Sequence, residues 1–271
     1  MPELPEVETV CAGLQPYVGE KVVNVTIRQP SLRWAVPDVL KSCLNGLKIK
    51  RLSRRGKYLL FEFQTGYLMV HLGMSGCLYI ESAEAEWKKH DHIFIKLESG
   101  FEMRYHDPRR FGSMHWVEGD PMRHRLLVRL GPEPLTEAFS AHYLYSRIKG
   151  KKKSIKATIM DHHVVVGVGN IYAAESLFYS GIHPLRPCSS LSLKSCAELV
   201  KVIKQKLQEA IKQGGTTLRD FRGSDNRPGY FKQSLAVYAR EGLSCHQCGA
   251  VIESVCISQR ASAYCPSCQP L

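Results

Sequence analysis

The stretch CHQCGAVIESVCISQRASAYCPSC, residues 245–268, predicts the structure at the C-terminal end of the chain. It holds two Cys-x-x-Cys pairs separated by sixteen residues, a spacing typical of sites in which four thiolates surround one zinc ion. The four candidate ligands are Cys245, Cys248, Cys265 and Cys268. Runs at 250–257 and 261–265 predict two strands, with Arg260 at the tip of the hairpin. Because four thiolates leave no open coordination position, we expect the zinc to be structural.

The segment that precedes this hairpin has helical periodicity. Leucine and isoleucine recur in i, i+4 steps through 192–213, and Gly214-Gly215 end the predicted helix. A second helix is predicted after Gly167-Val168-Gly169-Asn170, whose glycines leave backbone N–H groups open to an anion. A simple turn into the helix explains these glycines at least as well. Lys151-Lys152-Lys153 precede a further predicted helix and add cations along which a phosphate chain could run.

The N-terminal half has mainly the periodicity of strands. After a predicted helix over 3–17, short apolar or alternating runs between turn residues predict strands at 22–27, 58–63, 67–72, 92–97 and 101–105. A β-sandwich behind an N-terminal helix is the simplest packing of these elements. Residues 130–134 (LGPEP) predict a linker. The expected fold class is therefore α+β, with a helix and sandwich, a helical domain and a zinc finger over 1–130, 131–242 and 243–271.

Composition favours a protein that binds a polyanion. Lysine and arginine exceed aspartate and glutamate by 37 − 25 = 12, which is typical of nucleic-acid binding first and acidic-membrane binding second. A basic protein without such a partner is the alternative. The sequence has no apolar run of eighteen residues and no leader, so we expect a protein that is neither membrane-spanning nor exported. Scattered thiols suit a reducing cytosol, and these are Cys11, Cys43, Cys77, Cys188, Cys196 and Cys256.

The N-terminus carries the clearest candidate for covalent chemistry. If Met1 is removed, Pro2 becomes a free secondary amine. A terminal amine has a pKa of about 8, so roughly a tenth of it is neutral and nucleophilic at pH 7. Attack on an aldehyde gives an iminium that cannot lose an N–H proton and acts as an electron sink for elimination. Glu3 offers a carboxylate for proton transfer. The alternative is a disordered start in which Pro2 only marks the beginning of a helix.

Two loops in the N-terminal half combine charged with apolar residues. The run HDPRRFG at 106–112 has a composition that suits a wedge in a base stack, and packing of Phe111 on the sandwich is the alternative. The run HLGMSG at 71–76 predicts a strand and turn with Met74 in the core. His90 and His92 suit phosphate contact or simple exposure better than a metal site. Arg260 at a hairpin tip supports no core, which favours contact with a groove or a phosphate.

The chain resembles the bacterial formamidopyrimidine-DNA glycosylase family, which repairs oxidised purines. The resemblance rests on motifs that occur in family order along the whole chain: PELPEVET from Pro2, RGKY from Arg55, HLGMSG from His71, KHDH from Lys89, DPRRFG from Asp107, GVGNIY from Gly167 and the four zinc-spaced cysteines. Leu4 differs from the glycine that is usual in the related endonuclease VIII branch. The resemblance implies a helix–two-turn–helix domain between the sandwich and the zinc finger.

The resemblance also implies an activity. It is that of a bifunctional DNA glycosylase and AP lyase of base excision repair, which removes 8-oxoguanine and formamidopyrimidines and then cuts the strand by β,δ-elimination. Pro2 would attack C1′ of the damaged nucleotide, Glu3 would transfer protons and Lys57 would act as a general acid or base. Arg260 would serve the δ step and grip phosphates beside the lesion. Zn²⁺ would be the one cofactor, since the iminium itself is the electron sink.

For DNA binding, the resemblance implies that Met74, Arg109 and Phe111 fill the hole left by the flipped nucleotide, with Arg109 facing the orphaned base. Further contacts to double-stranded DNA would come from His71, His90, Lys151 and Asn170. Residues 218–225 match the loop that closes over the extruded base, within a polar segment at 218–230 that we expect to be a mobile loop. We expect a monomer, since the DNA would use one continuous face of the protein. The resemblance and the composition together predict a location in the bacterial cytoplasm, associated with the nucleoid through DNA and not with a membrane.

Three other functions stay open on the sequence. An endonuclease VIII-like glycosylase would prefer oxidised pyrimidines, although Leu4 and the three hole-filling residues favour oxidised purines. A zinc-ribbon DNA-binding protein without catalysis explains the charge and the cysteines but not an exposed Pro2 beside Glu3. A tautomerase with an N-terminal proline explains Pro2 only.

Overall fold

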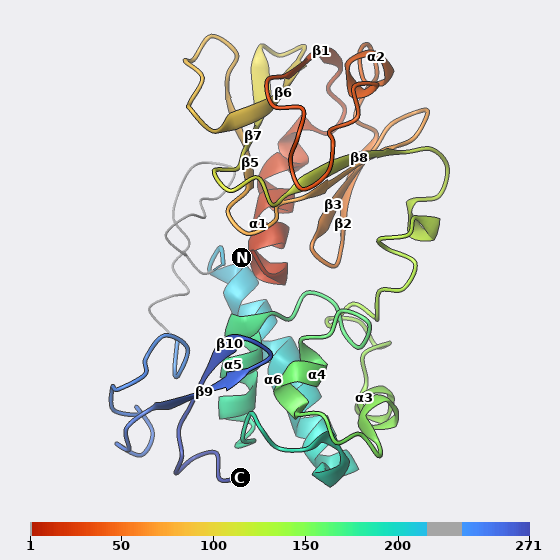
Figure 1. The fold of residues 1–271 in the computed structure, drawn as a ribbon. Coiled ribbons are helices and arrows are strands. Elements are labelled where there is room, and N and C mark those ends of the chain that lie inside the picture. Colours follow the sequence, from red (N-terminus) through yellow and green to blue (C-terminus); the bar gives the residue numbers. More distant parts are fainter. Residues whose placement is uncertain (1, 216–234) are drawn as a thin grey trace. The chain divides into compact units, whose positions relative to one another are not determined.

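The computed structural model describes residues 2–215 and 235–271 (Figure 1). Within them, internal contacts define two compact units, residues 2–128 with 213–215 and residues 129–212 with 235–271. The C-terminal hairpin thus belongs to the same unit as the helices. The predicted division into three domains remains a prediction. The predicted loop at 218–230 lies outside the described residues.

The first unit is built on two four-stranded antiparallel sheets (Figure 1). One has the order β1-β6-β7-β5 and contains β1 (Val22–Ile27), β5 (Cys77–Ser82), β6 (Asp91–Leu97) and β7 (Phe101–His106). The other has the order β2-β3-β4-β8 and contains β2 (Arg51–Arg55), β3 (Tyr58–Glu62), β4 (Tyr67–His71) and β8 (Ser113–Val117). Helical elements of this unit are α1 (Leu4–Leu14), α2 (Leu40–Cys43) and the short 3-10 turns η1 (Gln15–Tyr17) and η2 (Pro121–Arg123).

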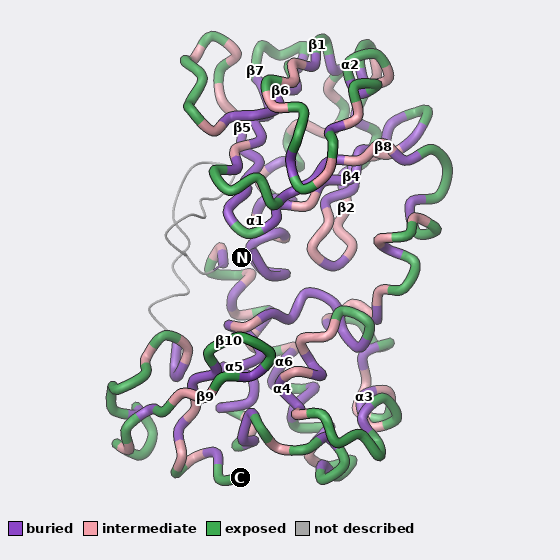
Figure 2. Tube along the Cα trace, in the orientation of Figure 1, coloured by how far each residue is buried: buried purple, intermediate pink, exposed green. Residues whose placement is uncertain are grey.

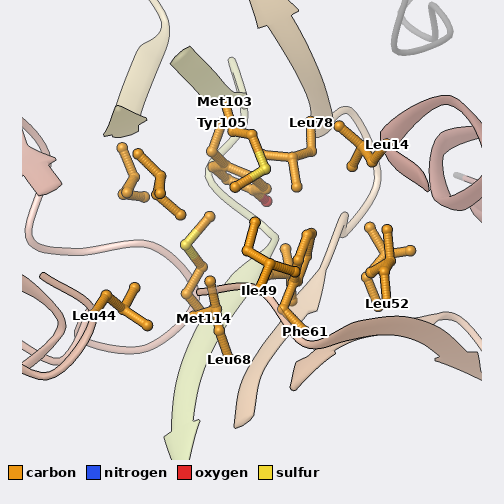
Figure 3. Packing of buried hydrophobic residues seen from close by; sticks show 14 of the residues in the cluster. Leu14, Leu44, Ile49, Leu52, Phe61, Leu68, Leu78, Met103, Tyr105 and Met114 are labelled. Atoms are coloured by element: carbon orange, nitrogen blue, oxygen red, sulfur yellow. The ribbon is translucent and has the colours of Figure 1, made fainter. Parts of the chain in front are cut away.

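Alternating apolar residues place a shared core between the two sheets. Figure 3 shows Leu78, Met103 and Tyr105 of one sheet facing Phe61 and Leu68 of the other. Helix α1 adds one apolar face to the same core, because its i, i+3 and i+4 positions point inward. The predicted α+β sandwich behind an N-terminal helix is confirmed.

Several predicted boundaries are wrong for local reasons. The first helix was expected over 3–17, but the α-helix ends at Leu14 and continues as a 3-10 turn, where Pro16 has no N–H to donate. The strand expected at 250–257 begins only at Glu253, after the turn that follows the first cysteine pair. The strand expected at 261–265 begins at Arg260, so this arginine opens the strand.

The second unit is helical, with one β-hairpin. Its elements are α3 (Ala141–Ile148), α4 (Ile155–Ile159), α5 (Asn170–Tyr179), η3 (Cys188–Ser190), α6 (Leu193–Lys212), β9 (Glu253–Ile257) and β10 (Arg260–Tyr264). Helix α5 is buried along almost its whole length (Figure 2). Ala174 and Phe178 of this helix pack against Ile252 and Ala263 of the hairpin region. Among the described residues, no helix is long and apolar enough to cross a membrane.

Candidate functional site

The N-terminal end of the described chain is held in place by carboxylates. Pro2 is buried, and Glu3 is the N-cap of α1. The Glu3 amide donates to the Glu6 carboxylate at 2.7 Å, and the two residues form a capping box. Glu6 is fully buried, and the backbone of Gly215 packs against it. Pro2 therefore lies directly before the capped start of α1.

The turn that carries Lys57 is tied to the same helix. Gly56 has a φ of +58°, which allows the tight β2–β3 turn that presents Lys57. Arg54 pairs with Glu8 of α1 at 2.5 Å and donates to the Gly56 carbonyl at 2.8 Å. A single guanidinium therefore joins α1, which follows Glu3, to the turn that carries Lys57. Sequence reasoning missed Arg54 in this role because its partner lies far away along the chain.

His71 is held as a neutral imidazole. Burial lowers its pKa to about 3, and the positive charges of Lys57 and Arg33 add to the effect. Its Nδ1 accepts the Gly73 amide at 2.9 Å, so the neutral ring carries its proton on Nε2. The ring also lies 4.7 Å from that of Tyr58. At neutral pH, His71 can therefore donate a hydrogen bond from Nε2 to an anionic oxygen without carrying a charge.

Three candidate hole-filling side chains project from two loops of the first unit. Met74 is 38% exposed, Phe111 is 49% exposed, and Arg109 is also exposed. The pattern-based expectation that Met74 lies in the core is wrong, because Gly73 has a φ of +67° and ends the alternation of β4. Phe111 is likewise too exposed to be a packing residue of the sandwich. Apolar side chains exposed on turns are typical of contact surfaces.

His90 lies in a small cluster of histidines. It is half-buried, and its ring is 6.3 Å from that of His92 and 5.8 Å from that of His106. His106 in turn contacts the buried carboxylate of Asp91 at 2.9 Å. His92 is buried, with its Nε2 at 2.8 Å from the Asp107 carbonyl. Of the two candidate histidines, only His90 is therefore available at the surface.

In the second unit, a buried lysine organises the candidate phosphate-binding groups. Lys156 of α4 is 1% exposed and donates to Asn170 Oδ1 at 2.7 Å and to Ser262 Oγ at 2.6 Å. Asn170 donates in turn to the Ala261 carbonyl at 3.1 Å. The first residue of α5 and the β10 strand are thereby joined. Sequence reasoning missed Lys156; the signal was a single lysine among apolar residues in the run SIKATIM.

Arg260 and Lys151 are both exposed. Ser258 and Gln259 have φ values of 49° and 63°, as a two-residue type I′ turn requires, and the turn brings Arg260 to the start of β10. A cavity of about 350 Å³ lies beside Arg260, lined also by Lys153 and Met160. Lys151 follows α3, where its amide donates to the Ile148 carbonyl at 3.0 Å. The hairpin tip and the α3–α4 connection therefore each present a cation.

The four predicted zinc ligands come together. The sulfur atoms of Cys245, Cys248, Cys265 and Cys268 all lie within 4.8 Å of one another. Two of the separations are 3.9 and 3.4 Å, close to the roughly 3.8 Å between sulfurs in a tetrahedron with Zn–S bonds of about 2.3 Å. The donor set and its geometry fit a structural metal ion.

Backbone amides around these sulfurs favour thiolates. The Gln247 amide donates to Cys245 Sγ at 3.4 Å and the Cys268 amide to Cys265 Sγ at 3.5 Å. Hydrogen bonding from the Ala250 amide, with a smaller contribution from the Cys265 side chain, lowers the pKa of Cys248 to about 7. Burial raises the pKa of Cys265, and it raises that of Cys268 to about 12. A metal ion binds deprotonated sulfur, so binding at this cluster would release protons from the thiols that burial keeps protonated.

Solved structures that superpose on this chain include DNA glycosylases. A variant of the Lactococcus lactis enzyme in complex with Fapy-dG-containing DNA superposes with a TM-score of 0.93 at 34% identity, over all of both chains. The MutM (Fpg) protein of Thermus thermophilus superposes with a TM-score of 0.89 at 38% identity, over 99% of this chain and 98% of that one. Fold and site together define the class as a DNA glycosylase of DNA repair.

Sequence comparisons give the family. Residues 1–114 match the formamidopyrimidine-DNA glycosylase N-terminal domain, and residues 130–222 match the H2TH domain of the same enzymes. The formamidopyrimidine-DNA glycosylase of Hydrogenovibrio crunogenus is 53% identical over 99% of this chain and 96% of its own length. That of Syntrophotalea carbinolica is 50% identical over 99% of this chain and its own full length. The chain belongs to the formamidopyrimidine-DNA glycosylase family, which confirms the resemblance drawn from its motifs.

Proposed function

We propose that the protein is a bifunctional glycosylase and AP lyase for oxidised purines, with Pro2 as its nucleophile. The observation that carries the proposal is the fixed start of α1, where the Glu3–Glu6 capping box immediately follows a buried Pro2. A nucleophile that is part of a capped helix needs no reordering before attack. Neither a binding protein nor a tautomerase would need this N-terminus within a DNA glycosylase fold.

The proposed chemistry assigns one step to each candidate catalytic residue. The Pro2 nitrogen attacks C1′ and the damaged base leaves, giving an iminium between the proline and the opened sugar. Loss of a C2′ proton expels the 3′ phosphate, and a second elimination expels the 5′ phosphate. Glu3 transfers protons during these steps, and Lys57, held beside α1 through Arg54 and Glu8, acts as a general acid or base. Arg260 assists the δ step.

The grip on DNA is divided among both units. We propose that His71, His90, Lys151, Asn170 and Arg260 bind phosphates, while Met74, Arg109 and Phe111 fill the hole left by the extruded nucleotide. Zinc bound by the four cysteines would hold the hairpin that carries Arg260 in shape. Double-stranded DNA is the partner, and one chain is the unit that binds it. The proposed location is the bacterial cytoplasm, at the nucleoid.

Structures of related enzymes guide the choice of substrates. Lactococcus lactis Fpg has been solved with DNA containing Fapy-dG, an abasic site or an oxidised pyrimidine, and a MutM structure contains carbocyclic 8-oxo-G. We propose 8-oxoguanine and formamidopyrimidines as the main substrates. Cleavage of 8-oxoguanine and thymine glycol duplexes, compared under the same conditions, distinguishes this preference from an endonuclease VIII-like one.

The deciding experiment is borohydride trapping on a duplex with 8-oxoguanine opposite cytosine, followed by peptide mass mapping. Reduction of the iminium should leave the DNA covalently attached to the N-terminal peptide at Pro2. Tight binding without an adduct and without cleavage would instead indicate a DNA-binding protein that lacks catalysis.

A further inference from the structure

Two neighbouring loops of the first unit carry the three exposed side chains described above. The Met74 loop comprises residues 72–76, and the Phe111 loop comprises residues 107–112. Their backbones are in direct contact: a Cβ added to Gly73 would lie 2.4 Å from both the Phe111 carbonyl carbon and the Gly112 nitrogen. No side chain fits between the two loops at this point, so neither loop can shift without moving the other.

A single buried carboxylate joins these loops through hydrogen bonds. Asp107 is 0% exposed, and its Oδ1 accepts the hydroxyl of Ser75 at 2.7 Å. Its Oδ2 accepts the Gly112 amide at 2.8 Å and the Tyr105 hydroxyl at 3.3 Å. Ser75 Oγ also accepts the amide of Arg109 at 3.3 Å. The Ser75 hydroxyl thus connects the Met74 loop to the Phe111 loop twice.

The chemistry of this group makes the connection stiff. Hydrogen bonds to an ionised acceptor are about twice as strong as those between neutral groups. Burial raises the pKa of Tyr105 well above its usual 10, so this phenol remains a donor to Asp107 at neutral pH. The single hydroxyl proton of Tyr105 is shared between Asp107 and the His71 carbonyl, also at 3.3 Å, at the end of the strand that leads into the Met74 loop. The three partners of Asp107 therefore hold it from both sides.

We propose that Asp107 is a positioning residue that, through Ser75, makes Met74 and Phe111 act as one wedge in damaged DNA. The proposal rests on the proposed function, because it concerns how the hole beside an extruded nucleotide is filled. A wedge of two independently moving loops would lose side-chain and backbone entropy for each insertion separately. A wedge on one rigid base loses less, so the contribution of each side chain depends on the other.

The test is a double-mutant cycle measured in three backgrounds. Met74→Ala, Phe111→Ala and their combination are prepared in the wild-type chain, in Ser75→Ala and in Ser113→Ala. Ser113 is the matched control, because its hydroxyl is buried in the adjoining strand and makes no hydrogen bond among the described residues. Single-turnover excision of 8-oxoguanine and the Kd for a duplex with a stable abasic-site analogue are measured for each variant.

The expected result is a coupling between Met74 and Phe111 of about tenfold in the wild-type and Ser113→Ala backgrounds. In the Ser75→Ala background, the coupling should fall to less than about threefold, since the connecting hydroxyl is gone. Asp107→Asn, which replaces one acceptor oxygen by a donor, should abolish it in the same way. Circular dichroism checks that each background is folded, and Ser75→Ala remains informative where Asp107→Asn does not fold.

The excision rate and the Kd together distinguish a failure of this proposal from a failure of the proposed function. A coupling that survives in Ser75→Ala, or that is absent from the wild type, overturns the role of Asp107 even when 8-oxoguanine is excised normally. A wild-type chain that cleaves nothing, yet shows the expected coupling in Kd for the abasic-site duplex, overturns the proposed catalysis and leaves the wedge standing. A chain that does not distinguish this duplex from undamaged DNA overturns both.

Discussion

Among the buried charged side chains of the described residues, Asp107 in the first unit and Lys156 in the second lie next to candidate DNA-contacting groups, and their charges are opposite. Asp107 in the first unit accepts hydrogen bonds from Ser75, Tyr105 and the Gly112 amide. Lys156 in the second unit donates to the Asn170 side chain and to Ser262. In both cases neutral dipoles contact the charge, and one of them comes from a segment that is distant in sequence: Ser75 lies 32 positions from Asp107, and Ser262 lies 106 positions from Lys156.

The difference between the two charges matches the groups that each of them holds. A carboxylate collects N–H and O–H donors, which are the free groups of tight loops such as those around Met74 and Phe111. An ammonium collects oxygen acceptors, which the start of α5 and the hairpin strand β10 offer. The first arrangement supports side chains proposed to enter the base stack, and the second supports groups proposed to grip phosphates. Lesion handling and backbone grip should therefore be separable by mutation.

The largest expected effect is a loss of strand cleavage while DNA affinity is retained. Extending the N-terminus so that the Pro2 nitrogen stays in an amide should lower strand cleavage by about 10³-fold or more, because the nucleophile is removed. The Kd for an abasic-analogue duplex should stay nearly unchanged. The same residues added after the exposed Leu271 are the control. Normal turnover by the N-terminally extended chain would exclude Pro2 as the nucleophile.

The next expected effect is a loss of DNA affinity when the four-cysteine metal site is disrupted. Cys248→Ser should release zinc and weaken DNA binding by about tenfold or more, because the hairpin that carries Arg260 loses its cross-link. Cys256→Ser is a matched control, since Cys256 is an exposed thiol of β9 outside the four-cysteine cluster. Zinc content by mass spectrometry and Kd by fluorescence anisotropy provide the measurement. If Cys248→Ser kept both zinc and affinity, the finger assignment would be wrong.

Much of the fold could be predicted because its core follows simple periodicity. Strands with alternating or continuous apolar residues, such as those at 22–27 and 58–62, are visible in the sequence. Strand β2 (RLSRR) was not predicted, because Leu52 is its single buried residue and the run shows no apolar periodicity. The segment is a strand because its backbone pairs with that of β3. Edge strands of this kind depend on a partner that local sequence does not indicate.

The candidate site likewise contains residues that local sequence predicts and residues that it does not. The four cysteines were predictable because spacing alone brings metal ligands together, and they do meet in the structure. Lys156 and Asp107 were missed as organising groups because each has one partner far away in the sequence: Ser262 lies 106 positions from Lys156, and Ser75 lies 32 positions from Asp107. No local pattern separates a lysine that will be buried from one that will be solvated. Burial and partner identity are properties of the folded chain.

The two buried charges should differ in what their loss affects. Lys156→Met and Asp107→Asn should each lower the free energy of unfolding by about 2–4 kcal/mol, because both leave buried polar groups unsatisfied. Lys156→Met should in addition raise the Kd for any duplex, whereas Asp107→Asn should mainly lower 8-oxoguanine excision relative to cleavage of an abasic site. Urea unfolding, Kd and both rates are compared with those of Lys194→Met, an exposed control on α6 of the same unit. Identical functional profiles would remove the distinction between the two units.

The smallest expected effect is a loss of folding stability at acid pH, and it concerns His71 in the first unit. The folded pKa of His71 is about 3, below the roughly 6.5 of an unfolded histidine, so below pH 6.5 the unfolded chain takes up a proton that the folded chain does not. Stability must therefore fall as the pH falls from 6.5 towards 3. Between pH 7 and 5, the wild type should lose about 1–2 kcal/mol more than His71→Gln, which has no proton to gain. Urea unfolding at both pH values measures this gap. Parallel losses in the two proteins would mean that His71 protonates normally in the folded state, and would contradict the neutral imidazole on which its proposed phosphate contact depends.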